Sequence, residues 1–314
     1  MIQTVTGTIE KRNIGKGLIH EHISCASNDF TKAFGKKWLD RENLAYYASD
    51  VLAIVKEKYN LGLFVDGTPV DLGRDAYLMK NTAENCGVHI VASSGFYWFP
   101  SMEADGNSDI EIAQWLISDC INGMEDTDIK PGILKVASGA PGITDEIVKR
   151  FSAVGITQKE TQLPVYVHCE HIDDTAFRQI ELLKNKGANP EKIIIGHCVH
   201  RLSIDYFIDI LKQGCYISID QCHCFPNRTP DIAKCIIELC QKGYSKKILI
   251  ANDYCIHSDF PSRKYNGLHL DKTVQAKNIG YVFDTVSDEF YKQGGKLADW
   301  EQITEQNTLD VLDV

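Results

Sequence analysis

The sequence predicts an α/β protein with the (β/α)8 barrel fold, in a single domain that spans residues 1–314. Eight short apolar runs alternate with helical or loop segments along the chain. Their apolar residues do not alternate strictly with polar ones, which is typical of parallel strands covered on both faces. A doubly wound open sheet is the alternative, but it usually carries a glycine-rich phosphate loop after its first strand, and none follows here.

The predicted strands are short, and turn-forming or polar residues separate each one from the helix behind it. Thr68 and Pro69 stop the second strand, and an aromatic loop at 96–100 follows the third. The strands are expected at residues 17–22, 62–66, 88–95, 132–137, 164–168, 192–197, 215–220 and 246–253.

Apolar residues that recur three or four positions apart predict the helices between these strands. Gly87 is placed to end the second helix, and Thr144 is placed to begin the fourth. Polar residues fill 24–37, which we expect to form a loop. The helices are expected at residues 38–58, 75–85, 109–120, 144–154, 174–184, 203–212, 231–241, 287–292 and 300–305.

The composition is that of a globular chain with a full core, with 44% hydrophobic and 24% charged residues. No apolar run approaches the ~20 residues that a membrane span needs. The formal net charge of -10 argues against a nucleic acid or an anionic membrane as partner. It does not exclude a small anionic substrate where bound metal ions dominate the local field. We therefore expect a small-molecule substrate, and the oligomeric state stays open, with a homodimer as one option.

The chain has 11 cysteines, and its N-terminus lacks a basic stretch followed by an apolar one. Both features predict free thiols in a reducing compartment, which is to say a cytoplasmic location. No two cysteines have C-x-x-C spacing. The densest group is Cys222-His223-Cys224, which buried thiols at a strand end explain better than a metal site does.

The first predicted strand ends in His20-Glu21-His22. Alternate residues of a strand share a face, so His20 and His22 point the same way and Glu21 turns away. Two neutral imidazoles this close together can bind one divalent metal ion. Because a bare pair of histidines often arises by chance, the interpretation depends on the other strand ends.

Metal-competent residues recur where later strands end: His168 ends the fifth, His197 the sixth and Asp253 the eighth. The C-terminal ends of all barrel strands meet on one face, where catalytic residues lie. One histidine at a strand end is more often a hydrogen-bonded core residue, and an aspartate after an asparagine often starts a turn. Those explanations suit each residue alone but not all of them at one end of the same barrel.

Lys135 lies within the fourth predicted strand, between apolar neighbours. Burial there would make a charged ammonium costly, lower the lysine pKa and expose a nucleophilic amine. Such an amine can add carbon dioxide to form a carbamate, whose two oxygens are able to bridge two metal ions. The alternative is a lysine whose stem packs in the core and whose ammonium reaches solvent.

These stretches resemble the phosphotriesterase family of the amidohydrolase superfamily. The likeness runs in order from about residue 15 to 255, and more weakly to Asn307. The matching stretches are 17–22, 65–69 with 73–75, 132–137, 167–168, 195–197 and 252–253.

The resemblance implies a binuclear metal site whose donors are nitrogen and oxygen. These donors suit two zinc ions, with manganese or cobalt as alternatives. It also implies hydrolysis in which a hydroxide between the metals attacks carbon or phosphorus, with Asp253 as catalytic base. The implied ligands are His20, His22 and Asp253 for one ion and His168 and His197 for the other, with N6-carboxylated Lys135 as the bridge.

Further roles follow from the resemblance for residues around the implied ligands. It places Asp220, which ends the seventh strand, just behind them, so that a proton relay could run from Asp253 through His223 to Asp220. Tyr97 fits the tyrosine that lactone-hydrolysing members carry in the aromatic loop. In contrast, Gln221 stands where those members often carry an arginine.

The loop after the eighth strand contains Arg263, Lys264 and Tyr265. Family members that act on phosphorylated sugar lactones grip the phosphate with basic and tyrosine residues in this loop. The resemblance therefore makes Arg263 and Tyr265 candidate substrate contacts, although a solvated polar loop explains them equally well.

The sequence thus predicts a binuclear-metal-dependent hydrolase. We expect a lactonase or carboxylic ester hydrolase for a small lactone, phosphorylated sugar lactones included. The alternative is a phosphotriesterase or phosphodiester hydrolase, because the same metal pair serves carbon or phosphorus. A more distant alternative is a non-catalytic binding protein on the same fold, against which the cost of an unused cluster of buried polar groups argues.

Overall fold

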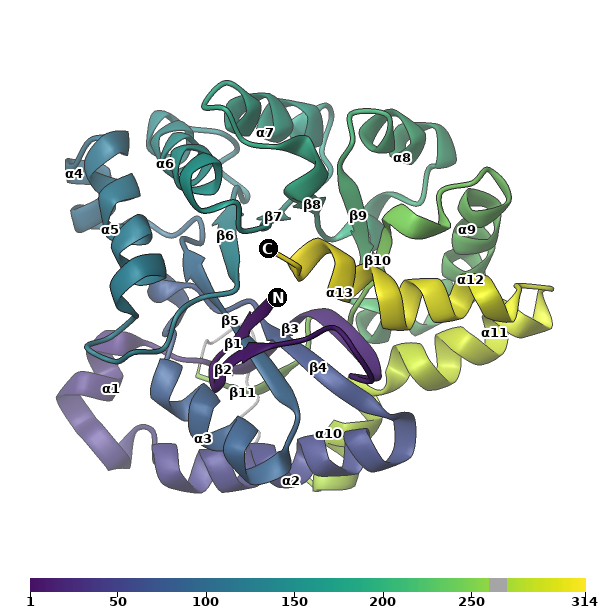
Figure 1. Ribbon diagram of the computed structural model, residues 1–314, viewed down its shortest axis with the longest axis horizontal. Coiled ribbons are helices and arrows are strands. Elements are labelled where there is room, and N and C mark those ends of the chain that lie inside the picture. The colour runs from purple at the N-terminus through teal and green to yellow at the C-terminus, as the bar shows by residue number, and fades with distance from the viewer. Residues whose placement is uncertain (260–269) are drawn as a thin grey trace.

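The computed structural model describes residues 1–259 and 270–314, and its strands form a ring surrounded by helices (Figure 1). The parallel strands are ordered β10-β9-β8-β7-β6-β5-β4-β3-β11, so that from β3 to β10 neighbours in the sheet follow one another along the chain, and β11 returns to pair with β3. This is the (β/α)8 barrel that the sequence predicts. Its strands are β3 (Lys16–Cys25), β4 (Leu61–Asp66), β5 (His89–Gly95), β6 (Ile133–Ala137), β7 (Val165–His168), β8 (Ile193–Ile195), β9 (Tyr216–Ile219), β10 (Ile248–Ile250) and β11 (Cys255–Ser258).

The eighth barrel strand has two parts, and together they close the ring. β10 pairs with β9 on one side, and β11 pairs with β3 on the other. Between them, the Glu21 carboxylate accepts the backbone N–H groups of Asn252, at 2.6 Å, and Tyr254, at 2.7 Å. The residue that separates His20 from His22 therefore fastens the first strand to the eighth.

Helices form the outer layer of the barrel, and their caps match the sequence signals. The Thr144 side chain accepts a hydrogen bond from Ile147 N, and Gly87 ends α3 with φ +65°. The helices are α1 (Asn28–Phe34), α2 (Arg41–Tyr59), α3 (Ala76–Cys86), α4 (Met102–Gly106), α5 (Asp109–Asn122), α6 (Asp145–Thr161), α7 (Thr175–Lys184), α8 (Ile204–Leu211), α9 (Thr229–Gln241), α10 (Lys272–Ile279), α11 (Ser287–Lys292), α12 (Leu297–Glu301) and α13 (Asn307–Leu312).

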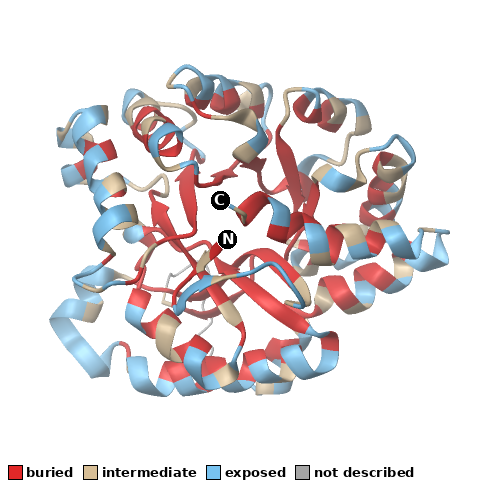
Figure 2. Ribbon diagram, viewed as in Figure 1, coloured by how far each residue is buried: buried red, intermediate tan, exposed pale blue. Residues whose placement is uncertain are grey.

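Apolar side chains form two buried clusters, one between the sheet and the helices and one inside the barrel. Figure 2 shows that the buried residues lie mainly on the strands, with further ones along the helices. A hairpin of β1 (Ile2–Thr4) and β2 (Gly7–Ile9), together with α13, covers the end at which the strands begin. The termini meet there, where Val314 N donates to Met1 O at 3.2 Å. The open end of the barrel is therefore the one at which the strands finish.

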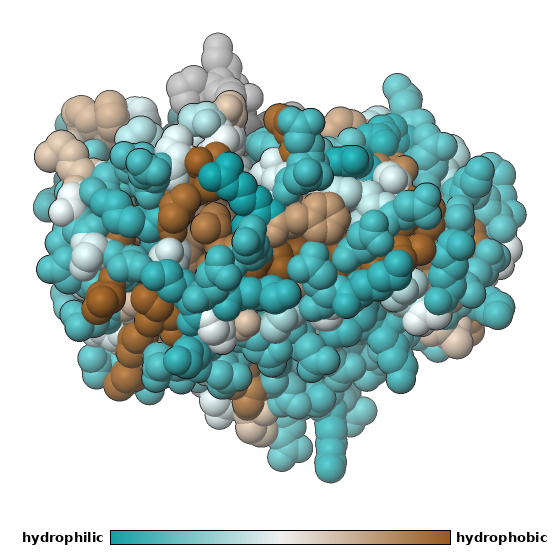
Figure 3. Space-filling model, turned by 90° about the horizontal axis from the view of Figure 1, so that it is seen from above, coloured by the Kyte–Doolittle hydropathy of each residue, from teal (hydrophilic) through white to brown (hydrophobic). Residues whose placement is uncertain are grey.

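The outer surface is mainly hydrophilic in the view of Figure 3, as expected for helices that bury only their inner faces. Within the described ranges, none of the helices combines the length and the hydropathy of a membrane span.

Two expectations about local structure are wrong. Residues 24–37 do not form a loop throughout, because β3 continues to Cys25 and α1 follows. Ser27 is the N-cap of α1 and accepts a hydrogen bond from Phe30 N, a capping signal that the polar composition hid. At the other end of the chain, a π-helical turn at 282–286 runs directly into α11, and another at 302–306 joins α12 to α13, so both helical stretches are longer than predicted.

Candidate metal centre

The alternation along β3 turns His20 and His22 into the barrel, where their ring centroids lie 5.0 Å apart. Asp253 Oδ1 lies 3.0 Å from His22 Nε2 and 3.6 Å from His20 Nε2. The closure of the barrel sets this approach, because Asp253 N donates to the backbone oxygen of His20 at 2.9 Å. The three side chains form one group that could hold a metal ion.

A second pair of imidazoles comes from β7 and from the residues that follow β8. His168 Nδ1 and His197 Nε2 face each other at 2.6 Å. The other nitrogen of each ring meets a carboxylate, Glu170 Oε1 at 3.0 Å and Asp220 Oδ1 at 2.9 Å. A carboxylate accepts hydrogen bonds, so these outer nitrogens carry the ring hydrogens and the facing nitrogens carry lone pairs.

Burial lowers the pKa of both His168 and His197, which favours the neutral form of each ring. Two lone pairs 2.6 Å apart repel each other, and a cation bound to both would remove this repulsion. The donor set therefore fits a metal ion, which binds neutral imidazoles through such lone pairs.

The outer nitrogens of the two β3 histidines also meet hydrogen-bond acceptors. His20 Nδ1 lies 3.3 Å from Asp220 Oδ2, which can only accept its hydrogen. His22 Nδ1 lies 2.8 Å from Thr68 Oγ1, and that hydroxyl donates to Ser24 O at 3.3 Å, so it accepts from the imidazole. His20 Nε2 therefore presents a lone pair to the interior of the centre, whereas His22 Nε2 faces Asp253 Oδ1 at 3.0 Å and carries a hydrogen there that a bound metal ion would replace.

Asp220 joins the two halves of the centre. It is 0% exposed and contacts the outer nitrogens of His20 and His197, one imidazole from each half. The Tyr166 hydroxyl also donates to it. A second group with the spacing of metal ligands consists of His20, His197 and Asp220. The ring nitrogens within this group donate to the carboxylate, so they offer no lone pair to an ion there. Asp220 is thus placed to orient two imidazoles.

Lys135 lies on β6 with 1% of its surface exposed, so its ammonium does not reach solvent. Its Nζ lies 2.8 Å from His20 Nε2 and 4.3 Å from the ring centroid of Tyr166. Its charge also contributes, after burial, to the low pKa of His168 and His197. The lysine therefore stands between the two halves of the centre.

The backbone at these strand ends is strained. His197, Gln221 and Asp253 have φ of 58°, 56° and 51°, in the left-handed region that costs a residue with a side chain about 1 kcal/mol or more. Such strain persists where the surrounding structure holds the residue in place. Gly67 shows how tight the site is, because a Cβ there would lie 2.5 Å from His20 Cδ2.

The second oxygen of Asp253 faces the rim. Gln221 Nε2 donates to Asp253 Oδ2 at 2.7 Å, and Gln221 Oε1 lies 2.7 Å from His200 Nε2. The carboxylate fixes the amide orientation, so His200 Nε2 must be the donor. Gln221 therefore fastens the eighth-strand carboxylate to the loop after β8.

Two other predicted residues lie around this core. The Tyr97 ring packs edge-on against His168, with centroids 5.1 Å apart. His223 packs against Tyr254 at 5.2 Å, with Cys224 Sγ 3.4 Å from its Nε2, so the relay through His223 to Asp220 stays a prediction. Arg263, Lys264 and Tyr265 lie outside the described residues.

The prediction of buried thiols at Cys222-His223-Cys224 is confirmed for Cys222 and wrong for Cys224. Cys222 is a buried thiol, but Cys224 is exposed, because a 3-10 turn rather than a strand carries the segment.

Sequence reasoning missed several side chains that orient the imidazoles, namely Thr68, Glu170 and Tyr166. Glu170 follows His168 by two residues, a spacing that could have suggested contact at a strand end. Thr68 and Tyr166 leave no such signal, because their partners lie 46 and 54 residues away.

His171 is a further histidine that sequence reasoning missed, and it supports the end of β8. Its Nε2 donates to Gly196 O at 2.7 Å, so its Nδ1 accepts from the Tyr206 hydroxyl at 3.0 Å. Burial lowers the pKa of His171 to about 4. The neutral ring thus braces the residue that precedes His197.

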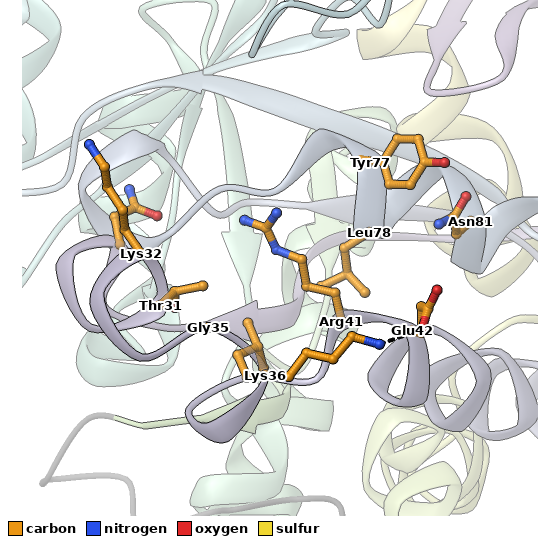
Figure 4. A pocket seen from close by; sticks show the side chains of 11 residues that line it. Thr31, Lys32, Gly35, Lys36, Arg41, Glu42, Tyr77, Leu78 and Asn81 are labelled. Atoms are coloured by element: carbon orange, nitrogen blue, oxygen red, sulfur yellow. Dashed lines mark hydrogen bonds and ion pairs between the residues drawn. The ribbon is translucent and has the colours of Figure 1, made fainter.

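A separate cavity of about 680 Å³ lies between α1, α2 and α3 (Figure 4). Lys36 and Glu42 form an exposed ion pair at its rim, 2.7 Å apart. None of the residues that line it lies on a barrel strand, so it is not part of the candidate metal centre.

Comparisons with known proteins agree with this geometry. The profile of the phosphotriesterase family matches residues 1–288. The chain is 32% identical to an aryldialkylphosphatase of Saccharolobus solfataricus, over 92% of this chain and 91% of that one. It is 24% identical to a phosphotriesterase homology protein of Mycobacterium tuberculosis, over 94% and 98%, and 26% identical to the N-acetyltaurine hydrolase of Homo sapiens, over 85% and 87%.

The fold and the clustered histidines define a metal-dependent hydrolase. The chain belongs to the phosphotriesterase family.

The role of Asp220 predicts the effect of replacing it with asparagine. The introduced amide would offer one carbonyl oxygen to two N–H donors, so one imidazole would have to move its hydrogen inward and lose its inner lone pair. We expect Asp220→Asn to weaken zinc binding about 10–100-fold while far-UV circular dichroism stays unchanged. Competition with a chelator measures the affinity, and Asp173→Asn, at an exposed site, is the matched control. Unchanged zinc affinity would contradict the orienting role.

His171 predicts a pH dependence of stability. Its folded pKa of about 4 lies below the ordinary 6.5, so the unfolded chain binds more protons between these values. Stability should therefore fall as the pH drops from about 6.5 towards 4, with a contribution on the order of 3 kcal/mol. His171→Gln keeps a donor and an acceptor but does not titrate, so its urea midpoint should change less over this range. An unchanged pH dependence of the urea midpoint in His171→Gln would contradict this role of His171.

Proposed function

We propose that this chain is a binuclear-metal-dependent lactonase or carboxylic ester hydrolase for a small substrate, phosphorylated sugar lactones included. The observation that carries the proposal is the inward convergence of four imidazoles from three strand ends around a buried lysine. Two zinc ions would bind there, with manganese or cobalt as alternatives. The proposed ligands are His20, His22 and Asp253 for one ion and His168 and His197 for the other, with N6-carboxylated Lys135 as the bridge.

Two bound metal ions would supply an activated water and polarise the reacting oxygen of the substrate. Asp253 would take the proton from the nucleophile at Oδ1, which faces His20 and His22, while Gln221 keeps Oδ2 turned to the rim. Tyr97 would form a wall for the substrate beside His168. Its edge-on ring and the neighbouring aromatic side chains suit an uncharged ring or acyl group.

A second candidate is hydrolysis of a phosphotriester or phosphodiester, and the 32% identity to an aryldialkylphosphatase favours it. Amide hydrolysis is a third, because relatives at 26% identity are N-acetyltaurine hydrolases. A binding protein without turnover is disfavoured, since the buried polar side chains and the strained backbone at the strand ends would then serve no chemistry.

The proposal also covers the cellular compartment and the partners of the enzyme. The 11 cysteines are all free thiols, which suits a reducing, cytoplasmic environment. The net charge of -10 disfavours nucleic acid and anionic membranes as partners. A homodimer stays a prediction from sequence alone.

The chemical state of Lys135 distinguishes the proposed bridged metal pair from a barrel with an unmodified lysine. If Lys135 is a carbamate, apoprotein reconstituted with zinc should regain activity slowly in bicarbonate-free buffer and faster when bicarbonate is added. Lys135→Ala should lose both metal and activity, because two cations would face each other in a shielded site without the bridging anion. Elemental analysis measures the metal, and acetate should restore part of the activity. Unchanged metal content with no response to bicarbonate would mean an unmodified lysine.

A substrate panel tests the reaction class. Metal-loaded protein is assayed with γ-lactones, simple carboxylic esters, a dialkyl aryl phosphate, a phosphodiester and an N-acyl taurine. We expect kcat/KM for the best lactone or ester to exceed that for the others about tenfold or more, a difference in transition-state binding of roughly 1.4 kcal/mol. The variant with both His20→Ala and His22→Ala should hydrolyse none of them. A preference for the phosphate or the amide would replace the leading proposal.

A further inference from the structure

Two polar side chains hold the backbone of Tyr97 from opposite sides. Asp71 Oδ1 accepts the Tyr97 N–H at 2.7 Å. Arg150 Nη1 donates to the Tyr97 carbonyl oxygen at 3.0 Å. Asp71 lies in a 3-10 turn, η2 (Val70–Leu72), after β4, and Arg150 lies in α6 after β6. The loop that follows β5 is thus held by the segments that follow both neighbouring strands.

Arg150 is a buried cation, with 1% of its side chain exposed. Its Nη1 also donates to Phe99 O at 2.7 Å, and its Nη2 pairs with Asp105 Oδ1 at 2.5 Å. The planar fork of a guanidinium can reach these groups together, which a lysine ammonium on a flexible stem does less well. A buried charge is costly unless it is paired and hydrogen-bonded, so the loop and this arginine depend on each other.

Apart from the contact with Tyr97, the buried Asp71 carboxylate has few hydrogen bonds among the described residues. Its second oxygen, Oδ2, is buried without a hydrogen bond in the described part of the chain, and Arg150 Nη1 is 4.0 Å away. Burial raises the pKa of Asp71 to about 6, which records the cost of placing the carboxylate there. Among the described residues, the Tyr97 N–H is the group of another residue that donates a hydrogen bond to the Asp71 carboxylate.

The consequence of this hold is the direction of the Tyr97 ring. With the backbone fixed on both sides, only the two side-chain torsions remain free, and neighbouring rings restrict these. The Tyr97 ring packs edge-on against His168 at 5.1 Å and 82°, and against Phe99 at 5.0 Å and 80°. Tyr97 thereby stands next to the candidate metal centre in one orientation.

We propose that Asp71 and Arg150 are positioning residues that set substrate binding through Tyr97. The proposal rests on the proposed function, because it takes Tyr97 as the wall of the substrate site. It predicts that loosening either hold weakens substrate binding without removing the metal ions, since neither residue contacts the imidazoles that face inward.

Steady-state kinetics on metal-loaded enzyme, with the best substrate of the panel, provide the first test. Arg150→Lys should raise KM about tenfold and change kcat less than about twofold, with the metal content unchanged. Asp71→Ala should do the same, whereas Asp71→Asn should behave like the parent because its Oδ1 still accepts the Tyr97 N–H. Arg74→Lys is the matched control, since Arg74 is another buried arginine, paired with Asp119 and Glu125.

A double-mutant cycle separates positioning from general stabilisation. In a Tyr97→Ala background, Arg150→Lys should raise KM no further, because the residue through which it acts is gone. An arginine that merely stabilises the fold would lower the melting temperature and change KM by the same factor in both backgrounds. That additive result would overturn the proposal.

A spectroscopic test works without any substrate. 3-Fluorotyrosine introduced at position 97 should give one sharp 19F resonance in the parent and in Arg74→Lys. In Arg150→Lys and in Asp71→Ala the resonance should broaden or split, because the ring samples several orientations. If no panel compound is hydrolysed, the proposed function fails and this spectrum still decides the positioning claim. One sharp, unshifted resonance in Arg150→Lys would overturn it.

Discussion

The facing nitrogens of His168 and His197, 2.6 Å apart, are the contact on which the centre depends. Glu170 and Asp220 take the outer hydrogens, and burial favours the neutral form of each ring. The fold therefore places two lone pairs close together, an arrangement that a bound cation stabilises. On β3, His20 also presents a lone pair inward, and His22 turns its Nε2 to the Asp253 carboxylate.

The closed barrel makes this arrangement possible, because every donor comes from a different strand end or from alternate positions on β3. A register slip of one residue on β3 would turn His20 and His22 out of the centre. Glu21 opposes that slip because its carboxylate accepts the backbone N–H groups of Asn252 and Tyr254. Asp253 lies between these two residues. Closure of the barrel and assembly of the centre are thus one structural event, with Asp220 linking its two halves.

The strands and the set of converging side chains could be predicted from the sequence, because both follow from local rules. Apolar runs locate the strands, and parallel strands in a barrel bring their C-terminal ends together, which is why His168, His197 and Asp253 could be grouped before any contact was known. What surrounds them could not be predicted. Tyr166 reaches Asp220 across 54 residues, and Arg150 reaches the carbonyl of Tyr97 across 53.

These longer contacts depend on the tilt of neighbouring strands and on loop paths, neither of which leaves a periodic signal. The turn that contains Asp71 is an example, because the sequence alone predicts that Asp71 is an ordinary solvated loop residue. The α1 helix was missed for a related reason: its short length and polar surface hide the capping residue Ser27. Local patterns thus define the ends of the barrel strands, whereas the side chains that orient and shape the centre require the folded chain.

Anomalous diffraction from crystals of zinc-loaded protein, recorded on both sides of the zinc absorption edge, tests the central claim most directly. The account predicts two zinc peaks, one among His20, His22 and Asp253 and the other between His168 and His197, with density for a carbamate on Lys135 between them. A single peak, a peak at the outer nitrogens beside Asp220, or no zinc in the barrel would contradict it.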